Sequence, residues 1–211
     1  MPYTSEQWTN RIAHRSDLSS QVVHLTRSCE VDGKKIGPVD VLMGILSEGR
    51  INGSTNNGFV CGTITATCFQ DVPLYSLSQN IHTEEDYRKK NEAAKIRYVG
   101  VGIMFPKPYV FQRGGRPVLY EITDKAKAIL PEDEWWRIVR FDLNRDDEFI
   151  DWTHEREWRV PGGFEFDLSE ATILLPNKYG YDRFLKLCEE LEDNDILHKI
   201  KGIVSLGAVF Y

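Results

Sequence analysis

The spacing of hydrophobic and polar residues along the chain switches between two periods, one typical of strands and one typical of helices. Short apolar or alternating runs predict strands at 21–26, 59–69, 96–105, 117–122, 152–166, 171–175 and 202–210. Apolar residues three and four positions apart predict helices at 38–49, 74–95, 123–130, 181–191 and 195–200, with a short amphipathic helix within 1–19. The segment 132–143 fits either element. This order of elements predicts an α+β fold of roughly seven strands with flanking helices.

The clearest local signals bound the predicted helix at 38–49. Pro38 suits the first helical position, where no backbone N–H is needed. Gly49 suits the position after the last turn, where the backbone often becomes left-handed. A turn is predicted at 32–35 (DGKK), and 52–58 (NGSTNNG) has the composition of a flexible loop.

The length of 211 residues is enough for one substantial hydrophobic core, so we expect a single domain over 1–211. Within it, 1–19 is expected to form an N-terminal appendage and 20–211 the core. Hydrophobic residues make up 41% of the chain and charged residues 27%, which is ordinary for a soluble globular protein. Because neither a signal peptide nor an apolar run of membrane-spanning length is recognised, we expect a cytoplasmic protein with reduced thiols and no membrane partner.

The charge and the cysteines narrow the classes of function. A formal net charge of −6 argues against a protein that holds nucleic acid by bulk electrostatics, although it permits a transient nucleic-acid substrate in a local basic groove. The cysteines form no CxxC pair and no His/Cys cluster at zinc spacing; they are Cys29, Cys61, Cys68 and Cys188. We therefore expect no metal site.

The segment 152–166 (WTHEREWRVPGGFEF) concentrates charged, aromatic and β-branched residues. If it forms a strand, Glu155, Glu157 and Arg159 share one face, because successive side chains point to opposite faces. Unpaired burial of these charges would cost several kcal/mol for each ion, so they are expected at a cleft or an edge. One interpretation is a solvated edge strand with a ladder of ion pairs, and the other is a functional face.

Two earlier motifs accompany this segment. His24-Leu25-Thr26 ends the first predicted strand, and the helix after it closes with 45–49 (ILSEG). This order resembles the opening of the ADP-ribosyltransferase superfamily, in which poly-ADP-ribose polymerases and RNA 2′-phosphotransferases carry a His-x-Thr/Ser strand before such a helix. The run 157–162 (EWRVPG) is similar to the strand that carries the catalytic glutamate in DarT-type DNA-modifying toxins. The resemblance implies an ADP-ribosyltransferase-like split antiparallel sheet.

The middle of the chain also resembles the AbiGi-type proteins of abortive phage infection and their relatives. The matching stretches are 68–74 (CFQDVPL), 100–103 (GVGI), 117–120 (PVLY) and 155–159 (EREWR). Together the two resemblances cover about residues 22 to 165. They imply a role in conflict between bacteria and phages.

The superfamily resemblance implies roles for individual residues. Transfer of ADP-ribose passes through a transition state with oxocarbenium character, so a fixed anion is needed near the ribose, and Glu157 is the candidate. His24 would bind the adenosine ribose, and Leu25 would hold the nicotinamide amide through its backbone. Many relatives carry glycine at the position of Leu25. Thr26 would offer a hydroxyl to the nicotinamide ribose, whereas the alternatives are a buried structural histidine and an ordinary strand threonine.

Four further residues have candidate roles in the same resemblance. Tyr120 would stack on the nicotinamide, or it belongs to the core. Arg27 and Arg50 would contact the diphosphate, since a guanidinium fork suits phosphate oxygens, or they are surface residues. Glu155 would position or deprotonate the acceptor as the first glutamate of a Glu-x-Glu pair. Its structural alternative is an ion pair with a neighbouring arginine.

These residues lead to one main hypothesis and two alternatives. The main one is a bacterial toxin or anti-phage ADP-ribosyltransferase that uses NAD and modifies a macromolecular acceptor, which is protein, DNA or RNA. The basic turn at 113–116 (RGGR) and the loop at 52–58 are candidates for lining an acceptor groove. The first alternative is a non-catalytic defence or antitoxin component of the same fold that binds a partner protein. The second is an enzyme that hydrolyses NAD without an acceptor.

Overall fold

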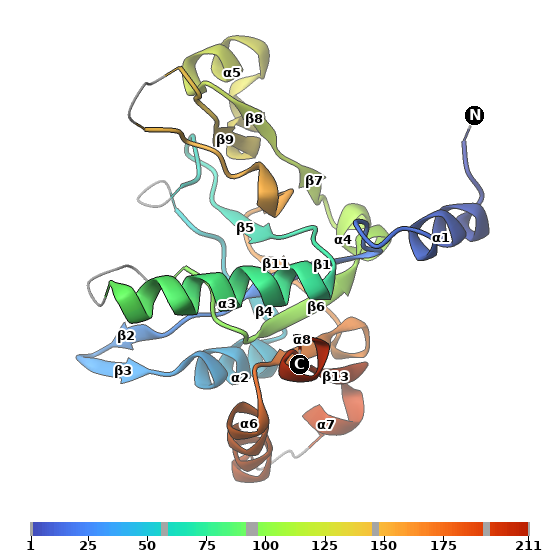
Figure 1. Ribbon diagram of the computed structural model, residues 1–211, viewed down its shortest axis with the longest axis vertical. Helices are drawn as coiled ribbons and strands as arrows, with labels where there is room; N and C mark the ends of the chain where they lie inside the picture. Colours follow the sequence, from blue (N-terminus) through green and yellow to red (C-terminus); the bar gives the residue numbers. More distant parts are fainter. Residues whose placement is uncertain (1, 56–58, 92–96, 145–147, 192–194, 211) are drawn as a thin grey trace. The chain divides into compact units, whose positions relative to one another are not determined.

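The computed structural model describes residues 2–55, 59–91, 97–144, 148–191 and 195–210 (Figure 1). The chain forms two compact units, each built from segments that are distant in sequence. The first unit comprises Met1–Gly49, Val72–Phe105 and Phe166–Tyr211, and the second comprises Arg50–Asp71 and Pro106–Glu165. Both contain helices and strands, so the predicted α+β class is confirmed. The grouping of the whole chain into a single domain stays a prediction.

A four-stranded sheet organises the first unit. Its strands follow the order β1 (Gln21–Leu25), β6 (Gly102–Pro106), β12 (Thr172–Leu175) and β13 (Gly202–Ser205). The strand β12 runs antiparallel to β6 and parallel to β13, with Ile173 opposite Ile103 and Ile203 in the two registers. Because residues 173–175 of β12 are all buried, this strand lies in the hydrophobic core, as its continuous apolar run requires.

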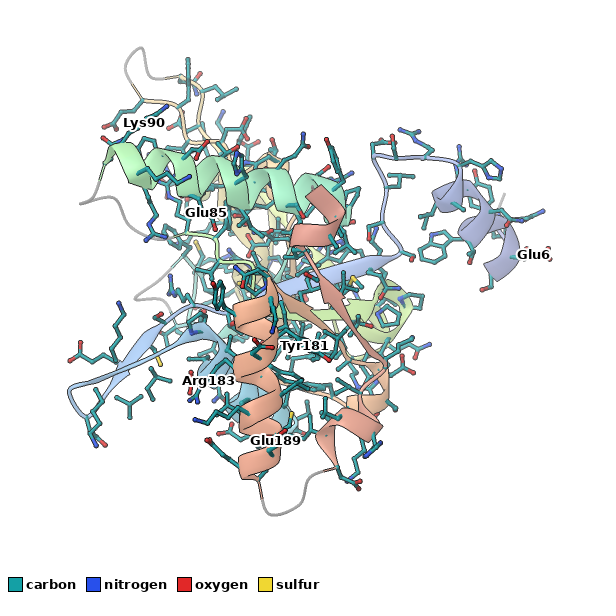
Figure 2. All side chains as sticks on the ribbon, turned by 60° about the horizontal axis from the view of Figure 1, so that its bottom comes forward. Glu6, Glu85, Lys90, Tyr181, Arg183 and Glu189 are labelled. Atoms are coloured by element: carbon teal, nitrogen blue, oxygen red, sulfur yellow. The ribbon has the colours of Figure 1, made fainter. Side chains whose placement is uncertain are left out.

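Helices and one hairpin complete the first unit. They are α1 (Ser5–Ala13), α2 (Pro38–Glu48), α3 (Leu74–Lys90), η3 (Leu168–Glu170), α6 (Lys178–Glu190), α7 (Ile196–Lys199), α8 (Gly207–Phe210) and the hairpin β2 (Cys29–Val31)–β3 (Lys34–Ile36). An ion pair between Arg183 and Asp40 joins α6 to α2. In Figure 2, polar side chains follow the exposed faces of α3 and α6, among them Glu85, Arg183 and Glu189.

The local signals around α2 are confirmed. The helix begins at Pro38, and Gly49 after it has φ of 62°, a left-handed conformation that suits glycine. The Gly49 N–H donates to the carbonyls of Ile45 and Leu46, which would otherwise lack partners at the helix end.

One prediction for the first unit is wrong in part, and the predicted turn at 32–35 is found within a larger hairpin. The segment 202–210 was expected to be one strand, but it forms β13 and then α8. The chain turns there because the N–H groups of Leu206 and Gly207 donate to the carbonyls of Leu175 and Pro176. The hairpin β2–β3 was expected only as a turn; Asp32 and Gly33 have positive φ, and short strands pair on both sides of them.

The second unit is built from small sheets. Its main sheet has the order β5 (Ala66–Phe69), β10 (Trp158–Pro161) and β7 (Arg116–Pro117), so β10 is the central strand. The remaining elements are β4 (Arg50–Ile51) paired with β11 (Phe164–Glu165), β8 (Leu119–Glu121) paired with β9 (Ile138–Arg140), the helices α4 (Lys107–Gln112) and α5 (Thr123–Ile129), and the 3₁₀ helices η1 (Glu132–Arg137) and η2 (Thr153–Glu155). Phe69 packs edge-on against Phe164, with ring centroids 5.2 Å apart.

The predicted continuous strand at 152–166 is wrong. Residues 153–155 form η2, Arg156 has φ of 46°, and only then does β10 begin. Gly162, with φ of 75°, separates β10 from β11. The predicted strand at 59–69 is likewise limited to β5, and α4 precedes the basic turn at 113–116.

The finer prediction of a split antiparallel sheet of roughly seven strands is not confirmed. Two pairs run parallel, β12 with β13 and β8 with β9. The predicted loop at 52–58 and the predicted helix at 74–95 each extend into residues outside the described part of the chain. Among the residues the structure describes, no helix has the length and apolarity needed to cross a membrane.

Candidate functional site

Glu157 and Arg159 form a buried ion pair in the second unit. Arg159 lies on β10 and Glu157 directly precedes this strand, so side chains two positions apart emerge on the same side. The Arg159 Nε donates to Glu157 Oε1 at 2.8 Å, and Nη2 donates to Oε2 at 3.3 Å. Arg159 is 1% exposed and Glu157 is 7% exposed, so the pair is removed from solvent. Burial of two charges is tolerated only when each has close partners.

The remaining N–H groups of Arg159 donate to backbone carbonyls. Nη1 lies 2.8 Å from the carbonyl oxygen of Trp136 and 3.1 Å from that of Ile138, and Nη2 lies 3.3 Å from that of Phe59. With the two bonds to Glu157, all five guanidinium donors have acceptors. Burial lowers the pKa of Arg159, but the charge of Glu157, the hydrogen bond to it and the neighbouring Cys68 and Cys61 together leave that pKa raised. The arginine therefore stays charged and ties η1, β9 and the segment at 59 to β10.

Cys68 and Tyr120 lie beside this pair. Cys68 is opposite Arg159 in the β5–β10 register, and burial together with the Glu157 charge raises the pKa of its thiol. The Tyr120 hydroxyl accepts a hydrogen bond of 2.7 Å from the Glu157 backbone N–H. Burial raises the pKa of Tyr120 to about 12, against the lowering effect of that hydrogen bond. Both groups are therefore protonated near neutral pH.

The predicted exposure of the charged face is wrong. β10 is flanked by strands on both sides, and Glu157 and Arg159 are buried, so the solvated edge strand does not form. Glu155 lies in η2, half-buried, and its carbonyl accepts from the Asp71 N–H at 3.0 Å. Because Arg156 turns the chain between them, Glu155 and Glu157 do not share a strand face as expected.

The motif His24-Leu25-Thr26 lies in the first unit, where β1 ends at Leu25. The Thr26 side chain is buried; its Oγ1 lies 3.0 Å from the Pro38 carbonyl oxygen and 3.3 Å from that of Val101. The hydroxyl proton is thus engaged by backbone at the start of α2, which leaves the oxygen lone pairs for any ligand. His24 and Leu25 are half-buried.

A glycine explains how closely the strands approach at this motif. A Cβ at Gly102 on β6 would lie 2.3 Å from the His24 carbonyl oxygen and 3.1 Å from the Leu25 Cα. A separation of 2.3 Å is shorter than any real Cβ contact, so only glycine fits here. The close approach of β6 to β1 therefore accounts for Gly102, the second of the two glycines within 100–103.

The two arginines predicted to contact a diphosphate are on the surface. Arg27 follows β1 and is exposed. Arg50 pairs with Glu165 across β4 and β11 at 2.6 Å, and its Nε donates to Asn52 at 3.3 Å. Arg50 is therefore already engaged with a carboxylate that a phosphate would have to displace.

The basic turn at 113–116 also has internal partners. The Arg113 guanidinium stacks over the Tyr109 ring at 3.6 Å, and that of Arg116 stacks over Phe111 at 3.9 Å. Arg113 contributes to a hollow that is also lined by residues 160 and 163–165. Cation–π contacts of this kind hold the guanidinium groups in place without neutralising them.

The structure thus brings two predicted site residues of the second unit together, Glu157 and Tyr120. Arg159 was expected on the same strand face as Glu157 but was assigned no role in the site, and Cys68 was not predicted near it. The Glu-x-Arg spacing was a usable signal for the first, because residues two apart on extended backbone share a side. No local signal identified Cys68. Among the described residues, no group of three or more potential ligands is arranged to hold a metal ion.

Comparisons with known proteins add little to this description. No family model matches the chain, and no curated protein matches it. Among solved structures, the chain is similar to one described as Thermus sp. 2.9 DarT in complex with NAD+, with a TM-score of 0.44 and 10% sequence identity. That similarity covers 91% of this chain and 98% of the other.

Proposed function

We propose that this protein is an NAD-dependent ADP-ribosyltransferase of bacterial toxin or anti-phage defence systems, which transfers ADP-ribose to a macromolecular acceptor. The observation that carries the proposal is the buried Glu157 carboxylate, whose two oxygens both accept hydrogen bonds from the Arg159 guanidinium. A carboxylate fixed in this way is the preorganised anion that an oxocarbenium-like transition state needs. The order of His24-x-Thr26, Gly49 and Glu157 along the chain supports the same assignment.

The Arg159 fork leaves the carboxylate able to act on a substrate. A carboxylate offers about four lone-pair sites, and the fork uses one on each oxygen. The Cys68 side chain also hydrogen-bonds this carboxylate, and a lone pair that remains can accept a hydrogen bond from a ribose 2′-hydroxyl. The negative charge then stabilises the positive charge that develops on the ribose as the bond to nicotinamide breaks.

In the proposed reaction the electron pair of the broken glycosidic bond leaves with nicotinamide, which becomes neutral. The acceptor nucleophile then forms a bond to the ribose carbon and gives up a proton, which Glu155 would take. His24 would bind the adenosine ribose, and the Leu25 backbone would hold the nicotinamide amide. Thr26 would reach the nicotinamide ribose through its oxygen lone pairs.

Three residues complete the proposed NAD contacts. Tyr120 would stack on the nicotinamide ring while its hydroxyl holds the backbone of Glu157. Arg27 would reach the diphosphate from its exposed position after β1. Arg50 would do so only by exchanging its Glu165 partner for a phosphate.

The test is incubation of purified protein with labelled NAD and total cell extract, followed by measurement of free nicotinamide and of label on protein, DNA and RNA. The proposal expects nicotinamide release and label on one class of macromolecule. Glu155→Gln is expected to keep nicotinamide release while labelling of the acceptor falls. Well-folded protein that releases no nicotinamide and labels nothing in several extracts would exclude the proposal.

A second candidate function is a non-catalytic defence or antitoxin module. It is favoured by the internal contacts of residues expected to bind NAD, such as the Thr26 hydroxyl and the Arg50 guanidinium. Thermal unfolding separates the two, because a ligand at a hundred times its dissociation constant stabilises by about 2.7 kcal/mol. No shift with millimolar NAD favours the binding module. Nicotinamide release without any labelled macromolecule indicates NAD hydrolysis instead.

A further inference from the structure

We propose that Arg159 is a positioning residue for catalysis: its guanidinium fixes the orientation of the Glu157 carboxylate that the reaction uses. This inference rests on the proposed transferase or hydrolase activity. It assigns to Arg159 a role that goes beyond neutralising a buried charge.

The fork geometry restricts the carboxylate. Two N–H groups of one planar guanidinium bind the two oxygens of Glu157, at 2.8 and 3.3 Å. Rotation of the carboxylate about its last bond would break at least one of these contacts. A bidentate pair therefore sets the plane of the carboxylate as well as its position.

The arginine is itself held by three further acceptors, all of them backbone carbonyls. Its Nη groups donate to the carbonyls of Phe59, Trp136 and Ile138, which lie in two segments of the second unit, at 59 and at 136–138. Arg159 is only 1% exposed, so surrounding atoms also limit its side-chain rotamers. The orientation of Glu157 is consequently set by backbone far from it in sequence.

Lysine is unable to reproduce this arrangement. Its ammonium carries the same charge but is a compact donor without a planar fork. In Arg159→Lys the carboxylate keeps a cation nearby and loses the restraint on its plane. Because misplacement of a reacting group by about 1 Å can cost 10²-fold in rate, kcat is expected to fall by about that factor. The KM for NAD should change by less than about threefold, since the contact acts on the transition state.

The experiment compares nicotinamide release by wild type, Arg159→Lys, Arg159→Ala and a matched control, Arg137→Lys. Arg137 also pairs with a glutamate, Glu134 at 2.9 Å, and its other hydrogen bonds in the described part of the chain go to the Pro117 carbonyl rather than to Glu157. The control is expected to retain wild-type kcat. Millimolar guanidinium is expected to restore activity to Arg159→Ala, whereas millimolar ammonium is not.

The possible outcomes are distinct. Reduced kcat with unchanged KM in folded Arg159→Lys, together with rescue of the alanine variant by guanidinium, supports positioning. Wild-type kcat in Arg159→Lys overturns it. Loss of folding in both Arg159 variants, or a folded alanine variant without rescue, assigns Arg159 a structural role only and also overturns it. A wild-type protein that releases no nicotinamide overturns the proposed function and, with it, this inference.

Discussion

Replacement of Glu157 by glutamine tests the buried ion pair without reference to any ligand. The change keeps the size of the side chain and one acceptor oxygen but removes the negative charge. The Arg159 guanidinium then stays buried, still bonded to three carbonyls, with no carboxylate to balance its charge. One of its donors also meets the new amide NH₂ in place of an acceptor oxygen.

The expected loss of stability follows from this burial. Removal of one partner from a buried ion pair costs about 3 to 5 kcal/mol, mainly because the other charge is left uncompensated. At about 3 °C for each kcal/mol in a protein of this size, the midpoint of thermal unfolding should fall by roughly 10 °C. The lower half of the energy range is the more realistic one, because glutamine retains one hydrogen bond to Arg159.

The measurement is chemical and thermal unfolding of Glu157→Gln alongside Glu165→Gln. Glu165 also pairs with an arginine in the same unit, but its side chain is 76% exposed. The control should therefore change the free energy of unfolding by no more than about 0.5 kcal/mol. The double variant Glu157→Gln/Arg159→Met removes both charges and should recover part of the loss. Equal, small effects of the two glutamine variants would refute the burial argument.

Three further predictions concern activity, packing and thiol chemistry. Glu157→Gln, assayed well below its unfolding midpoint, should lower nicotinamide release by about 10²-fold or more while the dissociation constant for NAD, from calorimetry, changes little. Gly102→Ala should unfold the first unit at markedly lower denaturant concentration, because its Cβ would lie 2.3 Å from a backbone oxygen of β1, whereas Gly44→Ala on α2 meets no atom within 4 Å and should be neutral or stabilising. The raised pKa of Cys68 keeps its thiol protonated, so mass spectrometry after alkylation at mildly alkaline pH should find exposed Cys29 modified well before Cys68. The same shift makes the Cys68 contribution to stability complete below the unfolded thiol pKa, and it is lost as the pH rises above that value.

Local sequence was sufficient to predict the structure where a few neighbouring residues decide the backbone conformation. Pro38 and Gly49 predicted both ends of α2, because the first needs no hydrogen-bond donor and the second tolerates a left-handed backbone. The α+β class followed from the periods of apolar residues, and the turn at 32–35 followed from Asp-Gly.

Sequence reasoning was insufficient wherever the outcome depended on distant segments. The predicted strand at 152–166 is interrupted because Arg156 adopts a positive φ. Neither Arg156 nor its sequence neighbours are residue types that predict such a backbone conformation. The predicted exposure of Glu157 failed because β5 and β7, far away in the chain, pair with both edges of β10. The burial of Glu157 depends on these partner strands, and the hydrophobic periodicity within one segment does not identify them.

The candidate site likewise combines features that are local in sequence with features that depend on distant segments. The sequence by itself determined that Glu157 and Arg159, two apart, emerge on one side of extended backbone, whereas the chemical roles of the site residues stay a prediction. Only the tertiary structure decided that this side is buried and that the carbonyls of Phe59, Trp136 and Ile138 hold the arginine. The physical reason is that a side chain's intrinsic geometry is local, whereas its desolvation and its remaining hydrogen-bond partners come from segments that meet it only in the folded chain.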